Sequence, residues 1–276
     1  MRLSASEKVR EYLKIETMIS IFATMALSSL FLDVTSEVRS SYQSLGRILE
    51  DRPMQVTGAR VGYDAGEFGR FGIRNWDVSS LTDRRADSHR HALYHTELGP
   101  TWQYDLKFCE NLTLKNDLTY SWTIYRGFRH GNGDRTYRWA QVIQSLENPY
   151  ITPFLRLRCC FHGNDYVYFR TGLRKRFNFW GDFYCTPSVY ADGGTSKLQK
   201  RNLGSKPDGG KWKDGVSSVT GRFELGWRIN GNFTAFGYIE QYGVVGSEAR
   251  RVNGRNPYKC AHNDWTHGGI GIRMKF

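Results

Sequence analysis

Apolar and polar residues alternate with a period of two along most of the chain beyond residue 53. From Leu112 to Ile124, nearly every second residue is leucine, isoleucine or aromatic, and threonine, lysine, aspartate and serine fill most positions between them. Successive side chains of a β-strand point to opposite faces, so this period predicts a strand with one apolar and one polar face. The same alternation recurs in 92–108, 165–179 and 215–229, and helical spacing fits none of these segments.

Eleven segments of this kind can be marked along the chain. They span 54–66, 68–78, 92–108, 112–126, 136–147, 151–160, 165–179, 182–192, 215–229, 232–245 and 265–276. Many run to roughly 12–16 residues, whereas strands of globular proteins average about 5–6 and a tilted membrane strand needs about 9–11. Single-chain bacterial barrels contain an even number of strands, so we expect ten or twelve and favour twelve. The glycine-rich stretch 54–78 is where we expect the boundary to be misassigned.

The connections between these segments alternate between short and long. Tight turns rich in asparagine, glycine and proline fall at 109–112, 147–150, 180–182 and 230–232. The longer polar loops are 79–91, 126–136, 160–165, 193–214 and 246–264. An up-and-down transmembrane barrel has this asymmetry, with short periplasmic turns and long extracellular loops. The pattern therefore predicts an all-β fold, an antiparallel transmembrane β-barrel of about 10–12 strands.

The last segment ends on an aromatic residue in mid-strand. Its apolar positions are Ile270, Ile272, Met274 and Phe276, with Arg273 and Lys275 between them. This ending resembles the carboxy-terminal signal of Gram-negative outer-membrane β-barrel proteins, a class whose final strand alternates apolar residues and ends in an aromatic. The resemblance is to an architecture and to no particular family. It implies insertion into the bacterial outer membrane, with the barrel assembly machinery reading the final strand.

The first 53 residues differ from the rest. Residues 18–32 form the only long apolar run, about 15 residues, which is short of the roughly 20 that a spanning helix needs. Four basic residues precede it, an order that predicts a signal peptide or short helical segment over 1–32. A short anchoring or buried helix is the alternative. We expect a linker over 33–53 and the barrel over 54–276.

Composition agrees with many strands and turns. Hydrophobic residues make up 39% and aromatic residues 14% of the chain, with 29 glycines and a mean hydropathy of -0.56. Aromatic residues favour strands, and glycine favours turns. The five cysteines match neither a disulfide framework nor a zinc-binding spacing. The sequence therefore predicts no metal site and no cofactor.

Charged residues at the polar positions of the predicted strands indicate what lines the interior of the barrel. The formal net charge is +12, and arginines alternate with apolar residues, so they would line the lumen if the apolar positions face lipid. The candidate pore-lining residues are Arg156, Arg158, Arg170, Arg174, Arg222, Glu224 and Arg228. Two interpretations stay open: an ion-paired, plugged interior, or a water-filled pore that favours anions. About twelve strands lie between small filled barrels and large open ones.

A hydrolase is the alternative to a passive pore or structural barrel. Some outer-membrane barrels are proteases or lipid hydrolases with catalytic residues at the outer rim. Histidines and aspartates near the predicted outer rim are Asp83, Asp87, His89, His91, His130, Asp134, His162, Asp165, His262, Asp264 and His267. General acid–base catalysis needs such groups within hydrogen-bond reach, but no G-x-S-x-G motif is present. We therefore assign no catalytic residue and favour a passive role.

The partners predicted by the charge pattern are lipids. Loop 193–214 is basic and rich in glycine, which favours contact with membrane lipid and anionic lipopolysaccharide. A soluble protein that binds nucleic acid would need arginines and stacking aromatics on one face. Here they alternate across each strand, which puts them on opposite faces and argues against nucleic-acid binding. The pattern carries no signal for an oligomeric state.

Overall fold

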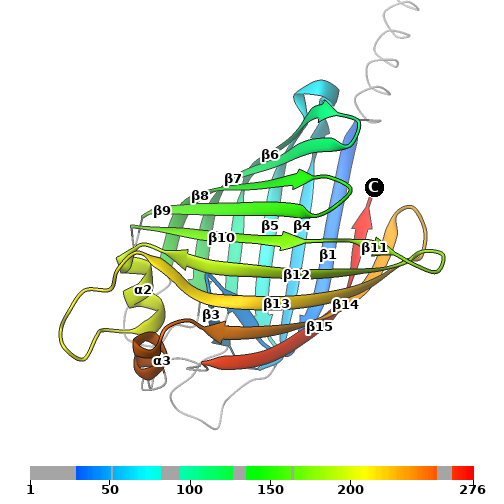
Figure 1. The fold of residues 1–276 in the computed structure, drawn as a ribbon. Helices are drawn as coiled ribbons and strands as arrows, with labels where there is room; N and C mark the ends of the chain where they lie inside the picture. Colours follow the sequence, from blue (N-terminus) through cyan, green and yellow to red (C-terminus); the bar gives the residue numbers. More distant parts are fainter. Residues whose placement is uncertain (1–28, 51, 82–93, 127–134, 163–164, 254–262) are drawn as a thin grey trace, which may run out of the picture.

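The structure is a computed structural model that describes residues 29–50, 52–81, 94–126, 135–162, 165–253 and 263–276. Within these residues, twelve long antiparallel strands wind around a common interior and form a closed barrel (Figure 1). The barrel strands are β1 (Leu30–Arg39), β4 (Met54–Asp64), β5 (Arg70–Ser80), β6 (Tyr94–Cys109), β7 (Leu112–Arg126), β8 (Arg135–Glu147), β9 (Thr152–His162), β10 (Tyr166–Arg174), β12 (Phe183–Gly194), β13 (Gly215–Arg228), β14 (Phe233–Val244) and β15 (Asp264–Lys275).

Neighbouring barrel strands along the chain pair with each other, and β1 pairs with β15 to close the barrel. In that seam Val34 is in register with Met274. Backbone pairing continues to the last residue, because the amides of Leu32 and Phe276 each donate to the other's carbonyl oxygen at 2.9 Å. The two-residue strand β11 (Phe177–Asn178) continues the path of β10 along β12.

The expected up-and-down antiparallel barrel is confirmed, and so is the preference for twelve strands. The boundary prediction needs a correction, because the twelfth strand is β1 and not a further strand within 54–78. The segment 33–53, expected as a linker, holds most of β1 and a hairpin inside the barrel. The start of β1 was concealed because residues 30–32 continue the apolar run of the expected leader. Residues 1–28 of that leader lie outside the described residues.

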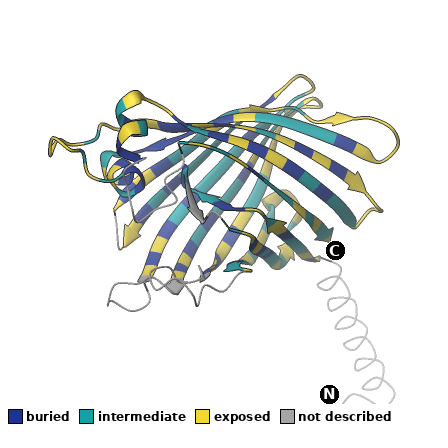
Figure 2. Ribbon diagram, turned by 90° about the horizontal axis from the view of Figure 1, so that it is seen from below, coloured by how far each residue is buried: buried dark blue, intermediate teal, exposed yellow. Residues whose placement is uncertain are grey.

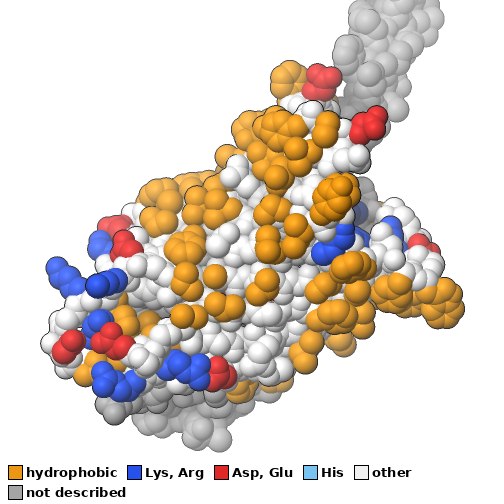
Figure 3. All heavy atoms as spheres, in the orientation of Figure 1, with side chains coloured by type: hydrophobic (Ala, Val, Ile, Leu, Met, Phe, Trp, Pro, Cys, Tyr) orange, Lys and Arg blue, Asp and Glu red, His pale blue; other side chains and the backbone are white. Residues whose placement is uncertain are grey.

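The barrel strands have one buried and one exposed face (Figure 2). The exposed face is apolar over much of the outer surface (Figure 3). Among the outward side chains, Ile270 is 71% exposed, and Val61 and Ile239 are exposed as well. Such a band suits lipid, whereas the polar positions between these residues point inward. None of the described helices is both long and apolar enough to cross a membrane.

The two ends of the barrel differ. Short turns join β4 to β5, β6 to β7, β8 to β9, β11 to β12 and β13 to β14, and the first of them contains the 3-10 helix η1 (Gly66–Phe68). We call this the short-turn end. The opposite, long-loop end carries α2 (Ser196–Leu203) and α3 (Ser247–Asn253) in its longer connections (Figure 1). The short turns lie where they were expected, and the predicted long loop 193–214 holds α2. The predicted long loop 160–165 is wrong, because β9 ends at His162 and β10 begins at Tyr166. Most of the predicted loops 79–91 and 126–136, and part of 246–264, lie outside the described residues.

The connection from β1 to β4 turns into the lumen. It forms the hairpin of β2 (Tyr42–Ser44) and β3 (Arg47–Glu50), joined by a two-residue turn at Leu45 and Gly46. Both turn residues have positive φ angles, 53° and 76°, as the tight turns that match the twist of a hairpin require. Residues 42–45 of the hairpin line a cavity inside the barrel, so the hairpin lies within the lumen.

Candidate functional site

A chamber of about 440 Å³ occupies the middle of the lumen. Strands from every side of the barrel contribute to its wall, and residues 42–45 of the hairpin line it as well. Its charged side chains are seven arginines and four carboxylates. They are Arg39, Arg60, Arg74, Arg156, Arg158, Arg170, Arg222, Asp33, Glu97, Asp117 and Glu240. The chamber wall thus carries three more positive than negative charges.

Four of the predicted pore-lining residues are on the chamber wall: Arg156, Arg158, Arg170 and Arg222. The other three lie closer to the short-turn end. Arg174 pairs with Glu147 at 2.8 Å, and Arg228 donates to the side chain of Asn178. Glu224 joins an ion-pair network that connects the chamber to this end. The sequence-based set therefore covers the length of the lumen and not one ring.

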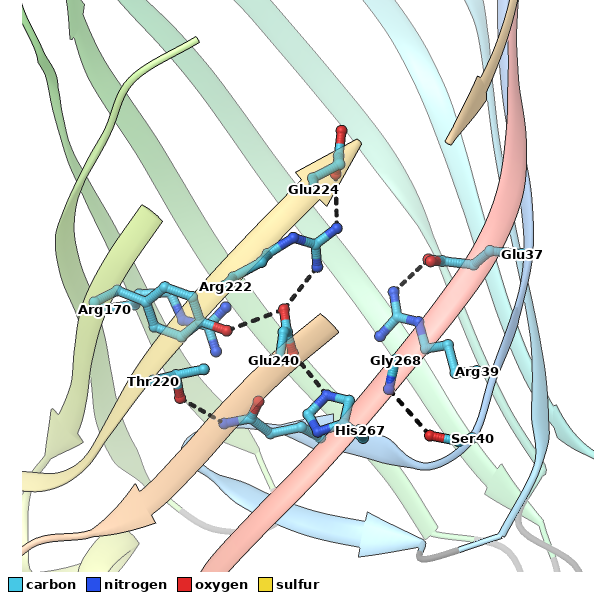
Figure 4. Close-up of polar contacts among 12 residues, drawn as sticks. Glu37, Arg39, Ser40, Arg170, Thr220, Arg222, Glu224, Glu240, His267 and Gly268 are labelled. Carbon is cyan, nitrogen blue, oxygen red and sulfur yellow. Dashed lines mark hydrogen bonds and ion pairs between the residues drawn. The ribbon is translucent and has the colours of Figure 1, made fainter. Parts of the chain in front are cut away.

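Strands β13, β14 and β15 carry this network (Figure 4). Arg222 is its centre, with one guanidinium nitrogen 2.6 Å from Glu240 and another 2.7 Å from Glu224. Glu240 also lies 2.6 Å from Nε2 of His267, and Glu224 lies 2.7 Å from Arg273. Opposite charges alternate along the wall, so the network offsets most of its own charge.

A second network lies on β6, β8 and β9. Glu97 is 3.3 Å from both Arg158 and His95, and all three side chains are almost completely buried. The side-chain oxygen of Gln141 accepts hydrogen bonds from Arg158 and, at 2.6 Å, from Nε of Arg156. Buried charges persist in proteins when they are paired and hydrogen-bonded, and Glu97 with Arg158 meets that condition.

Arg170 forms the third buried pair. Its Nε and Nη2 donate to the two carboxylate oxygens of Asp192 at 2.7 and 3.1 Å, a bidentate geometry. The hydroxyl of Tyr168 also bonds to Asp192, whose side chain has no exposed area. Arg170 stacks over the ring of Tyr190 with 4.0 Å to the ring centroid. This arginine is thus held in place by structural contacts.

Two chamber arginines differ from the other five. Arg39, Arg60, Arg158, Arg170 and Arg222 each pair with a carboxylate. Among the described residues, Arg74 and Arg156 do not. Arg74 stacks over Trp76 at 5.0 Å, and Arg156 donates only to Gln141. The positive charge that the chamber presents to a solute is therefore concentrated at these two side chains.

The hairpin crosses the lumen at the long-loop end of the chamber. Tyr42 packs against His95 of β6, with 5.7 Å between ring centroids. Across the lumen, the carbonyl oxygen of Gly46 accepts hydrogen bonds from Tyr242 and Ser218. Burial raises the pKa of the Tyr42 phenol. Tyr42 and Leu45 belong to an apolar cluster with inward residues of β4, β5, β8, β9, β10 and α2.

Side-chain exposure increases along the lumen away from this hairpin. His95, near the long-loop end of β6, is 1% exposed. Asp117, in the middle of β7, is 20% exposed, and Arg174, at the short-turn end of β10, is 43% exposed. The chamber is therefore more accessible from the short-turn end than from the long-loop end.

Four of the proposed rim residues for a hydrolase belong to the described residues: His162, Asp165, Asp264 and His267. His267 does not face the rim, because its side chain points into the lumen and contacts Glu240. Asp264 pairs with Arg250 at 2.9 Å, and Asp165 is exposed. The contacts described for His267 and Asp264 thus do not join them to each other or to Asp165. The other seven candidates lie outside the described residues.

The basic loop 193–214 contains α2. Lys197 and Lys200 of this helix are exposed, as contact with an anionic surface requires. Arg201 lies instead over the rings of Tyr137 and Tyr166, at 5.3 and 5.2 Å from their centroids.

Sequence analysis missed several residues that shape the chamber. Gln141, Asp192 and Glu240 occupy polar positions of predicted strands, so the alternation indicated that they point inward. Their partners lie on other strands, and a partner can be assigned only when the register between strands is known. The hairpin had a weaker signal, since 42–50 is too short to distinguish from a polar linker.

A closed antiparallel barrel with an apolar outer band and a polar interior defines the class. The protein is a transmembrane β-barrel of the outer-membrane type.

Comparison with known proteins gives no family for it. No protein-family model matches the sequence, and no curated protein matches it at a significant level. Among solved structures, the KdgM porin is similar over 89% of this chain and 99% of its own, with 12% identity and a TM-score of 0.43. The NanC porin covers 89% and 100% with 10% identity and a TM-score of 0.43. Outer membrane phospholipase A from Escherichia coli covers 89% and 95% with 12% identity and a TM-score of 0.41.

Proposed function

We propose that this protein is a small passive pore of the bacterial outer membrane whose lumen favours anions. The observation that carries the proposal is the chamber, whose wall includes Arg74 and Arg156, and neither arginine pairs with a carboxylate of the described residues. Fixed positive charge in a narrow pore attracts anions and repels cations. The low polarizability of the surrounding protein strengthens this field relative to bulk water.

The chamber arginines do not contribute equally in this proposal. Arg158, Arg170 and Arg222 are neutralised by adjacent carboxylates, so their charges act on a solute mainly as dipoles. Replacing one of them would leave a buried carboxylate without its partner, which changes folding as well as selectivity. Arg74 and Arg156 can be replaced without that complication.

Ion selectivity in a planar bilayer tests the proposal. We expect the wild-type barrel to give discrete conductance steps and a reversal potential that indicates anion preference. The double variant Arg74→Gln and Arg156→Gln should bring the anion-to-cation permeability ratio close to unity, because the unpaired charges are gone. The matched control, Lys197→Gln with Lys200→Gln, removes two exposed charges outside the chamber and should keep the wild-type ratio. A cation-selective wild type, or a double variant with unchanged selectivity, would refute the proposal.

A structural barrel with a closed interior is the second candidate, and the hairpin favours it. The apolar cluster and the hydrogen bonds to Gly46 hold the hairpin across the long-loop end of the lumen. In this case the folded barrel would be electrically silent. Folding is checked separately, from the shift in electrophoretic mobility between unheated and heated samples, so a silent folded barrel is distinguished from a failed refolding.

A further inference from the structure

We propose that Arg156, Gln141 and Arg74 form a binding site for one oxyanion, the carboxylate or phosphate group of a small solute. The inference rests on the proposed function in one respect, since the solute has to enter the chamber. It adds a recognition step, because the site would hold a particular kind of group and not merely favour negative charge.

The first argument is the position of Arg156. It is in register with Arg170 across β9 and β10, and Arg158 lies two residues further on the same face of β9. Residues directly opposite on paired strands have Cβ atoms about 4.5–5.5 Å apart, so Arg156 and Arg170 start from neighbouring positions of the wall. All three arginines line the same chamber. Arg170 and Arg158 are held by Asp192 and Glu97. Arg156 in the middle has no carboxylate among the described residues.

The second argument is the direction of hydrogen bonds at Gln141. Its oxygen accepts from Nε of Arg156 and from Arg158, which fixes the amide group so that its NH2 is directed away from them. Gln141 is only 4% exposed, so water does not readily reach this nitrogen. The nitrogen nevertheless has no hydrogen-bond acceptor among the described residues. Buried polar groups of native proteins almost always have a partner. An oxyanion in the chamber would supply the acceptor.

The third argument is that the chamber's own acceptors are already in use. Asp33 lies 3.3 Å from Arg70, and Asp117 lies 2.7 Å from Arg60. Glu97 and Glu240 pair with arginines as described above. None of the four chamber carboxylates is paired with Arg74 or Arg156. The positive charges of these two arginines therefore remain available to a ligand.

The chemistry of the site selects the ligand class. Nε of Arg156 is bonded to Gln141, which leaves its two terminal NH2 groups for a ligand, and the planar guanidinium matches two oxygens of a carboxylate or phosphate. Arg74 approaches from β5, where Trp76 supports its guanidinium plane. A monatomic anion such as chloride offers a single acceptor atom, so it cannot place a separate acceptor opposite each NH2 group. The cavity of about 440 Å³ is large enough for a small organic anion.

Calorimetric titration of the folded protein in maltoside micelles tests the site without a membrane. Succinate and inorganic phosphate are titrated in separate experiments, so that the two oxyanion sources are distinguished. Chloride is titrated in a third experiment at the same ionic strength. We expect saturable binding of at least one oxyanion and none of chloride. Arg156→Gln should abolish binding, and Arg156→Lys should weaken it because the charge remains without the planar fork. Arg74→Gln, which disturbs no hydrogen bond to Gln141, should weaken binding as well. Lys200→Gln, on the exposed face of α2, is the control and should bind as the wild type does.

The outcomes separate this inference from the proposed function. Saturable oxyanion binding that requires Arg156 supports the site, and if the same barrel conducts no ions the pore is refuted while the site stands. Anion-selective conductance without saturable binding keeps the pore and refutes the site. Equal binding of chloride, or wild-type binding by a folded Arg156→Gln variant, also refutes it.

Discussion

Single residues of the lumen differ greatly in what their charge does. Asp192 accepts two hydrogen bonds from Arg170 and one from Tyr168, and its side chain is completely buried. Glu147 forms a similar pair with Arg174, but its side chain is 35% exposed. Water screens the second pair and cannot reach the first carboxylate. The two pairs therefore allow the contribution of burial to be measured within one barrel.

Asp192→Asn should destabilise the barrel far more than Glu147→Gln. The asparagine keeps the shape but leaves Arg170 with no counter-charge, and breaking a buried pair typically costs about 3–5 kcal/mol. An exposed pair contributes about 0–1 kcal/mol, which is the expectation for Glu147→Gln. Urea unfolding of the barrel in micelles, followed by tryptophan fluorescence, gives both values. Similar losses for the two variants would show that the chamber is as well hydrated as the short-turn end.

At the scale of elements, the hairpin of β2 and β3 has the least typical position. Its turn depends on Gly46, which has a φ of 76° and approaches the wall closely. A Cβ atom added there would lie 2.8 Å from Cβ of Asp192 and 3.1 Å from the hydroxyl oxygen of Ser217. A larger residue at this position would therefore adopt an unfavourable backbone conformation and would also clash with the barrel wall.

Gly46→Val should displace the hairpin from the wall and open the long-loop end. If the barrel is a pore, we expect more frequent or larger conductance steps than in the wild type. Gly231→Val is the control, because that glycine lies in a short turn, has no positive φ, and has no atom within 4 Å of an added Cβ. A Gly46→Val barrel that is folded and conducts like the wild type would show that the hairpin does not limit the path.

The elements also show how far the sequence determines the structure. The segment 112–126 was predicted with the bounds that β7 has, because thirteen or more residues of alternation leave little freedom for another assignment. β1 could not be found in this way, because its first residues continue the apolar run 18–32. That run was interpreted as part of a signal peptide or short helical segment. The ion pairs of Arg222 and the hydrogen bonds that Gln141 accepts depend on the register between strands, which alternation within one strand does not contain.

At the scale of the whole molecule, the carboxy-terminal strand closes the barrel, and we expect a second role in assembly. We propose that Ile270, Ile272, Met274 and Phe276 are read during assembly in the outer membrane. Of these, Ile270, Ile272 and Phe276 are exposed. The same strand forms the seam with β1. The aromatic ring of Phe276 also contacts Phe233 edge to face, with 5.6 Å between centroids.

Phe276→Ala should separate these two functions. Loss of the terminal ring should reduce the amount of barrel in the outer membrane several-fold in cells, while refolding into micelles remains close to that of the wild type. Phe179→Ala is the control, since it removes an exposed aromatic ring from the short-turn end outside the final strand. Quantitative immunoblotting of membrane fractions measures the first effect and electrophoretic mobility the second. Equal loss in both measurements would assign the ring to stability and not to assembly.

The seam between β1 and β15 also determines the order in which the molecule can form. Val34 meets Met274, so the pairing that closes the cylinder joins the first strand to the last. Until the final residues have been made and delivered, β1 has an unsatisfied edge, and such an edge pairs readily with other chains. Contacts between distant parts of a chain also form slowly. A cell that makes this protein therefore has to keep the preceding strands unclosed and protected until the twelve residues of β15 are available for pairing.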